Sequence, residues 1–96
     1  MKYQNTFQQS EQPSQTYLSC YTYRGEENVS FPRHFHSYYE ISYIISGKRY
    51  ETLNNEKFEV GDNTLIFIPP LTIHNLNNKT DVKDIVIQFD HKFLRN

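Results

Sequence analysis

A chain of 96 residues makes one small domain, and a domain of this size buries only about 60% of the surface that its unfolded chain exposes. The formal net charge is −1, and the ten Lys and Arg are scattered among eleven acidic residues, so we expect no basic face for nucleic acid. One cysteine, and an N-terminus without the apolar segment of a signal peptide, indicate a soluble cytoplasmic protein with no membrane partner.

The residue content favours β-structure. Alanine, the best helix former, is absent, while Val, Ile, Thr, Phe and Tyr supply much of the apolar and β-branched content. We therefore predict an all-β domain before any motif is considered.

In chain order, residues 1–15 contain five Gln and little to bury, which predicts a flexible N-terminal arm. Short alternating or apolar runs follow, and Asn54-Asn55 between two of them is typical of a two-residue hairpin turn. The predicted strands cover residues 16–23, 29–31, 38–46, 64–68, 72–76 and 82–89, with a hairpin over 48–60. About eight strands at these spacings predict a sandwich or barrel.

Turn and loop signals separate the later strands. Gly61-Asp62 predicts a turn, and the polar run from Asn77 to Asp81 predicts a loop. Asp90 is a candidate helix cap, so residues 91–96 predict the start of a truncated C-terminal helix.

Ligand-type side chains gather in one stretch. His34, His36 and Glu40 occupy positions of equal parity, so in a single extended strand all three side chains would share one face. His74 is a fourth such residue downstream. Imidazole and carboxylate suit Zn, Ni, Fe or Mn, so these four residues are candidate metal ligands.

The spacing His34-x-His36-x3-Glu40-x6-Gly47, followed by Gly61-Asp62, Pro69-x4-His74 and Asn78, resembles the two motifs of the cupin superfamily. The resemblance implies a small double-stranded β-barrel, a cupin-type jelly-roll, in which the four candidate residues hold one metal ion. Asn28 and Leu71 stand where the family has glycine. Leu is a poor residue for a positive φ, so we expect the loop from Pro69 to His74 to differ from the family pattern.

A narrower resemblance covers the His-x-His before Tyr-Tyr-Glu, the Gly-Asp before an aliphatic strand, and the closing Gln-Phe-Asp-x-x-Phe-Leu. This pattern is similar to the N-terminal effector-sensing domain of AraC-type transcriptional regulators of bacteria. It implies a sensor barrel over residues 16–90, a linker helix from 91, and a DNA-binding helix-turn-helix half that is absent from this chain. DNA would then be a partner only through that missing domain, and a homodimer is compatible with the resemblance.

The effector expected inside the barrel is a small molecule such as a sugar. Tyr38 and Ser42 share parity with Glu40, so we add them to the four motif residues as candidate ligand-binding residues. No cofactor is required by this interpretation, since the cluster can equally line the barrel mouth without a metal. Two alternatives stay open: a metal-dependent cupin enzyme, either dioxygenase or isomerase, and a stand-alone cupin that binds sugars without signalling. We favour the sensor and expect no enzymatic activity.

Overall fold

A computed structural model describes residues 16–95, and the predicted arm at residues 1–15 lies outside them. Within this range the chain forms eight strands and one short helix. In order they are β1 (Leu18–Gly25), β2 (Ser30–His34), β3 (Tyr39–Ser46), β4 (Arg49–Leu53), β5 (Glu56–Val60), β6 (Thr64–Ile68), β7 (His74–Asn78), β8 (Val82–Phe89) and α1 (His91–Arg95).

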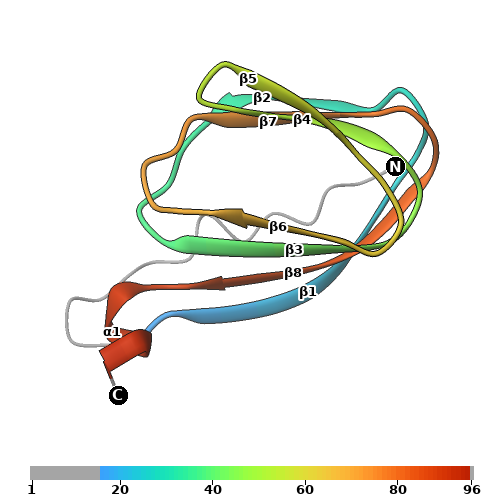
Figure 1. Cartoon of the computed structure of the whole chain (residues 1–96). Coiled ribbons are helices and arrows are strands. Elements are labelled where there is room, and N and C mark those ends of the chain that lie inside the picture. The colour runs from blue at the N-terminus through green and yellow to red at the C-terminus, as the bar shows by residue number, and fades with distance from the viewer. Residues whose placement is uncertain (1–15, 96) are drawn as a thin grey trace.

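The strands form two four-stranded sheets that lie one above the other (Figure 1). One sheet has the order β1-β8-β3-β6 and the other β2-β7-β4-β5, and every recorded pair is antiparallel. The connections β2–β3 and β6–β7 run between the two layers at the same end of the molecule. The predicted all-β class is confirmed. The end of the barrel with these two connections carries the candidate residues His34, His36 and His74.

Strands β6 and β8 have the bounds that the sequence predicts, β3 starts one residue later, and β1, β2 and β7 differ at both ends. β2 continues past Pro32 to His34, with an irregular register between Phe31 and His34 that accommodates the proline. β7 starts only at His74 and includes Asn77 and Asn78, so the loop predicted to begin at Asn77 is wrong there. The backbone of Asn78 is aligned with Arg49 in β4, and ladder pairing does not require an apolar side chain.

The turns form as the residue types predict. Asn54 and Asn55 have φ of 48° and 72°, which is the left-handed conformation that a two-residue hairpin between β4 and β5 requires. At the next turn the Asp62 carboxylate accepts a hydrogen bond from the backbone N–H of Gly47 at 2.8 Å. The two family motifs are therefore joined directly, at the end opposite the histidines.

The interior is unusually polar for so small a domain. Among the described residues nine buried side chains are apolar and nine are polar or charged. In β3 the even positions Glu40, Ser42 and Ile44 are buried, as the alternation predicts. A free cysteine is usually among the most buried residues, which predicts a core position for Cys20. Cys20 is instead exposed, because it lies on the outer face of β1.

Helix α1 is capped as expected: the Phe93 N–H donates to the Asp90 carboxylate at 3.0 Å. The Phe93 ring lies 5.6 Å from the Phe89 ring, which attaches the helix to the end of β8. No helix among residues 16–95 has the length and apolar character needed to span a membrane.

Candidate functional site

The three histidines lie close together, although they do not share the single strand that their sequence spacing predicts. β2 ends at His34 and β3 begins at Tyr39, and these strands belong to different sheets. The idea of one extended strand presenting His34, His36 and Glu40 is therefore wrong. The chain passes from one layer to the other between them, and His36 lies in that connection.

The fold nevertheless brings the imidazoles together. His34 is the cross-strand partner of His74, and their ring centroids are 4.2 Å apart. The His36 ring lies 5.0 Å from that of His74 and 6.1 Å from that of His34. One ligand-type nitrogen from each of the three residues lies within 4.8 Å of the other two. The cluster, hereafter the histidine cluster, thus comes from β2, the β2–β3 connection and β7.

Backbone carbonyls orient all three rings in the same way. The Nδ1 atoms of His34, His36 and His74 lie 3.1, 3.0 and 2.9 Å from the carbonyl oxygens of Pro32, Tyr38 and Thr72. A carbonyl oxygen only accepts, so each Nδ1 carries the proton. In the neutral form of such a ring Nε2 is the lone-pair atom, which is the arrangement that metal-binding histidines have.

Glu40 adds a carboxylate to the histidine cluster. Its Oε1 lies 3.3 Å from His36 Nε2 and accepts a hydrogen bond from the Gln88 amide at 3.0 Å. Burial by itself would raise the pKa of Glu40, but the His36 ring, which donates to this carboxylate when its Nε2 carries a proton, and the Gln88 amide outweigh it and hold this pKa below its ordinary value. Glu40 is therefore an ionised, acceptor-only group next to the imidazoles.

His74 is the most enclosed of the three histidines. Burial lowers the pKa of His74 below its ordinary value, and the hydrogen bond to the Thr72 carbonyl offsets only part of that effect. His74 is therefore neutral over a wider pH range than an exposed histidine, as a ligand-donating imidazole must be.

The loop before His74 keeps a glycine-like backbone although it holds no glycine. Leu71 has φ of 66°, and Asn28, the other position where the family has glycine, has φ of 68°. The Leu71 N–H donates to the His36 carbonyl at 2.8 Å. This bond fixes the connection that carries His36 against the loop that leads to His74.

The two other candidate residues have different surroundings. Tyr38 is buried and its ring stacks on that of His36, with centroids 4.1 Å apart. Ser42 is also buried, and its hydroxyl donates to the Asp84 carboxylate at 2.7 Å. Tyr38 thus borders the histidine cluster, whereas Ser42 belongs to a second polar group deeper in the barrel.

That second group, which the sequence reading missed, centres on Arg49. Its guanidinium donates to Glu51 and to Asp84, each at 2.8 Å, and all three side chains are buried. Because Arg49 and Glu51 both lie in β4 and Asp84 lies in β8, the Arg49–Asp84 ion pair crosses between the sheets. Parity was the available signal, since Asp84 shares the inward face of β8 with Val82 and Val86.

One guanidinium does not neutralise two buried carboxylates. Burial raises the pKa of Glu51 to about 7, and the attraction of Arg49 lowers it only in part. Burial also raises the pKa of Asp84, against the attraction of the same arginine. The barrel interior therefore carries excess negative potential, which favours a proton or a cation.

The donor set of the histidine cluster fits a divalent metal ion. Three imidazoles and a carboxylate are ligands of Zn, Ni, Fe and Mn, and their Nδ1 bonds to carbonyls supply the outer-shell support that such ligands need. Ligand nitrogens bound about 2.1 Å from one ion lie roughly 3.4 Å apart, so only a modest inward movement is required. The three histidines can therefore form a metal site.

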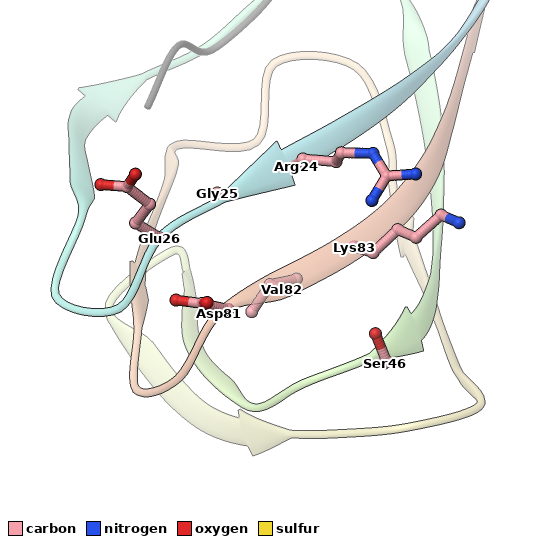
Figure 2. Close-up of a pocket in the computed structure, with 7 residues that line it drawn as sticks. All are labelled: Arg24, Gly25, Glu26, Ser46, Asp81, Val82 and Lys83. Carbon is pink, nitrogen blue, oxygen red and sulfur yellow. The ribbon is translucent and has the colours of Figure 1, made fainter.

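A surface hollow of about 460 Å³ lies away from the histidine cluster, where β1 ends and β8 begins (Figure 2). Arg24 and Lys83 extend to one side of it, and Glu26 and Asp81 to the other. None of its lining residues belongs to the histidine cluster, so its size does not make it the better candidate site.

Two antiparallel sheets with histidines at one end define a cupin-type barrel. A family model described as the AraC-like ligand binding domain matches residues 16–96. The chain belongs to this family of ligand-binding domains.

Sequence relatives are matched over short stretches. The chain is 51% identical over 39 residues to the uncharacterized protein MJ1618 of Methanocaldococcus jannaschii, covering 41% of this chain and 31% of that protein. It is 29% identical over 59 residues to the uncharacterized HTH-type transcriptional regulator YbfI of Bacillus subtilis, covering 62% of this chain and 21% of the regulator. The chain thus spans a third or less of the curated relatives that it matches.

Solved structures support the fold alone. An RmlC-like cupin from Shewanella frigidimarina superposes with a TM-score of 0.72 at 17% identity, over 79% of this chain and 70% of that one. A predicted oxalate decarboxylase from Thermotoga maritima gives a TM-score of 0.68 at 19% identity, over 72% and 63% of the two chains. The cupin fold predicted from the motifs is confirmed.

Proposed function

We propose that this chain is the effector-sensing domain of a transcriptional regulator, and that a small oxygen-rich molecule such as a sugar binds beside the histidine cluster. The observation that carries the proposal is the convergence of His34, His36, His74 and Glu40 at one end of a barrel of the AraC-like ligand-binding family. Imidazoles and an ionised carboxylate are suitable partners for hydroxyl groups. Tyr38, stacked on His36, would border the effector, and Ser42 would take part by exchanging its hydrogen bond to Asp84 for one to the effector.

In this proposal the DNA-binding helix-turn-helix half lies outside the present chain, and α1 is the start of the helix that links the two parts. The similarity to a regulator of the HTH type supports it. The effector would act by binding one arrangement of the full regulator more tightly than another, since equal affinity shifts no equilibrium. A cytoplasmic location and a homodimer are part of the same proposal.

We infer that binding requires no cofactor, with a divalent cation as the alternative occupant of the histidine cluster. Held by His34, His36, Glu40 and His74, such an ion would supply a Lewis acid for an effector oxygen. Elemental analysis of the purified chain separates the two versions: about one equivalent of Zn, Ni, Fe or Mn supports the cation.

The test of sensing is a thermal-shift screen of sugars and related metabolites. An effector at a hundred times its Kd should stabilise the chain by about 2.7 kcal/mol, and the shift should grow with concentration. His74→Ala should abolish that shift, whereas His91→Ala, on the exposed helix α1, should retain it. Equal loss in both variants, or no hit in the screen, would count against the proposal.

We infer a sensing role rather than a catalytic one because the matched family is a ligand-binding one. The enzyme alternative is tested directly by loading the chain with Mn²⁺ or Fe²⁺ and incubating it with oxalate, the substrate named for one structural neighbour. Turnover of oxalate would contradict the sensing proposal.

A further inference from the structure

A second cavity opens at the side of the barrel, away from the histidine cluster. It lies between the edge strands β5 and β6, which belong to different sheets, and its volume is about 300 Å³. It reaches inward to β4. None of its lining residues is a member of the histidine cluster: they are Glu51, Leu53, Phe58, Glu59, Val60, Thr64, Leu65, Ile66 and Phe67.

The lining of this cavity, hereafter the edge cavity, is mostly apolar, and its only charged residues are acidic. Six of its nine lining side chains are apolar, two are carboxylates, and no basic residue lines it. The rim is aromatic and accessible, with Phe58 and Phe67 exposed by 42% and 48%. Walls of this kind suit a small apolar body, and the volume is at the lower end of ligand pockets.

The polar group at its inner wall is Glu51, which is only 3% exposed. Its Oε2 accepts the hydrogen bond from Arg49 at 2.8 Å, whereas no hydrogen bond to Oε1 is recorded within residues 16–95. Arg49 also donates to Asp84 at 2.8 Å, so one cation serves two buried carboxylates. A positively charged head placed at Glu51 would supply the missing charge.

We propose that the edge cavity is a second ligand site, and that it takes a small molecule with an apolar, preferably aromatic, body and a primary ammonium head bound by Glu51. Charge complementarity selects the head, because an anion would meet Glu51 and Glu59 with no cation on the walls. The apolar walls disfavour a bare metal ion, which needs several oxygen or nitrogen ligands. This site would be occupied independently of the histidine cluster.

The test is an NMR titration of the ¹⁵N-labelled full chain with three ligands of similar shape: 2-phenylethylammonium, 2-phenylethanol and 3-phenylpropanoate. We expect the ammonium compound to bind about tenfold more tightly than the alcohol, since it adds a charge-assisted hydrogen bond, and the carboxylate to bind least. Amide shifts should be confined to residues 51–67. Equal affinities for the three compounds, or shifts centred on His74, would overturn the proposal.

Two matched variants test whether Glu51 binds the ammonium head of the ligand. Glu51→Gln should reduce the affinity for the ammonium compound to that for the alcohol, whereas Glu59→Gln, which removes an exposed carboxylate paired with Lys79, should leave most of the preference. Should Glu51→Gln fail to fold, the three-ligand comparison on the unaltered chain still decides. Failure of the amine to bind leaves the effector proposal untouched, since that proposal concerns the histidine cluster.

Discussion

Leu71 is held in a backbone conformation that residues with a β-carbon rarely adopt. Its φ of 66° is fixed by the N–H bond to the His36 carbonyl, while its side chain is 65% exposed and contributes little burial. The left-handed conformation costs such a residue roughly 1–2 kcal/mol. In this conformation the Leu71 N–H reaches the His36 carbonyl and holds the loop before His74 against the connection that carries His36.

Leu71→Gly should therefore stabilise the domain, by about 0.5–1 kcal/mol after the larger unfolded-state entropy of glycine is subtracted. Leu65→Gly is the matched control, since Leu65 is 62% exposed but lies in strand β6 without a positive φ. It should destabilise by about 0.5–1 kcal/mol. Chemical denaturation measures both changes, and equal signs would contradict the strain argument.

Glu51 makes stability depend on pH. Its pKa is raised from 4.5 to about 7, so the folded state favours the protonated carboxyl. The stabilising contribution is complete below the unfolded-state pKa and is lost as pH rises toward the folded-state pKa. The loss amounts to about 3 kcal/mol over that window.

Glu51→Gln removes this titration. The unfolding free energy of the variant, relative to the parent, should therefore increase by about 3 kcal/mol as the pH rises from about 4.5 to above 7. The difference between the two proteins is the quantity to measure, because His74 and Asp84 titrate in both. A difference independent of pH would show that folding does not raise the pKa of Glu51.

At the scale of the elements, the residue pattern predicted most of the strands. Alternation and turn residues located β6, β8 and the β4–β5 hairpin, because those signals are local. The predicted bounds were wrong at strand ends whose extent depends on pairing with a partner strand. β7 includes Asn77 and Asn78 because β4 and β2 supply their ladder, and no local signal in a run of polar residues indicates that.

Gly47 lies where the turn between β3 and β4 contacts the backbone at the start of β8. A β-carbon there would lie 2.2 Å from the Asp81 carbonyl oxygen and 2.8 Å from Val82 Cα, and its φ is 109°. The turn between β3 and β4 thus touches the backbone at the start of β8, and both the contact and the φ exclude a side chain.

Gly47→Ala should consequently destabilise the domain by about 3 kcal/mol or more, from backbone strain and overpacking together. Gly61→Ala is the control, because its β-carbon would meet nothing nearer than 3.6 Å and its φ is not positive. It should change stability little. Thermal and denaturant unfolding of the two variants gives the comparison, and similar losses would refute the steric explanation.

For the whole molecule, the ion pair of Arg49 with Asp84 connects the two sheets through the interior. Arg49→Met would leave Glu51 and Asp84 buried without their cation, and removing one partner of a buried pair typically costs about 3–5 kcal/mol. We expect a loss of that size in denaturant unfolding. Lys79→Met, which breaks the exposed pair with Glu59, should have little effect.

Removing all three buried charges tests the ion-pair network of Arg49, Glu51 and Asp84 in a second way. The triple replacement of Arg49, Glu51 and Asp84 by apolar residues of similar volume should recover much of the stability that Arg49→Met loses, because no uncompensated charge remains. If Arg49→Met alone is neutral, the network does not hold the sheets together.

The sequence by itself determined the β class, most strand positions, the turns and the four motif residues, because alternation, turn chemistry and motif spacing are readable from neighbouring positions. Only the tertiary structure decided that His34 and Glu40 belong to different sheets, that His36 lies in the crossing between them, and that Arg49 pairs with Asp84. The physical reason is that strand pairing and burial join residues far apart in the chain. The charge balance of the interior is a property of that assembled whole.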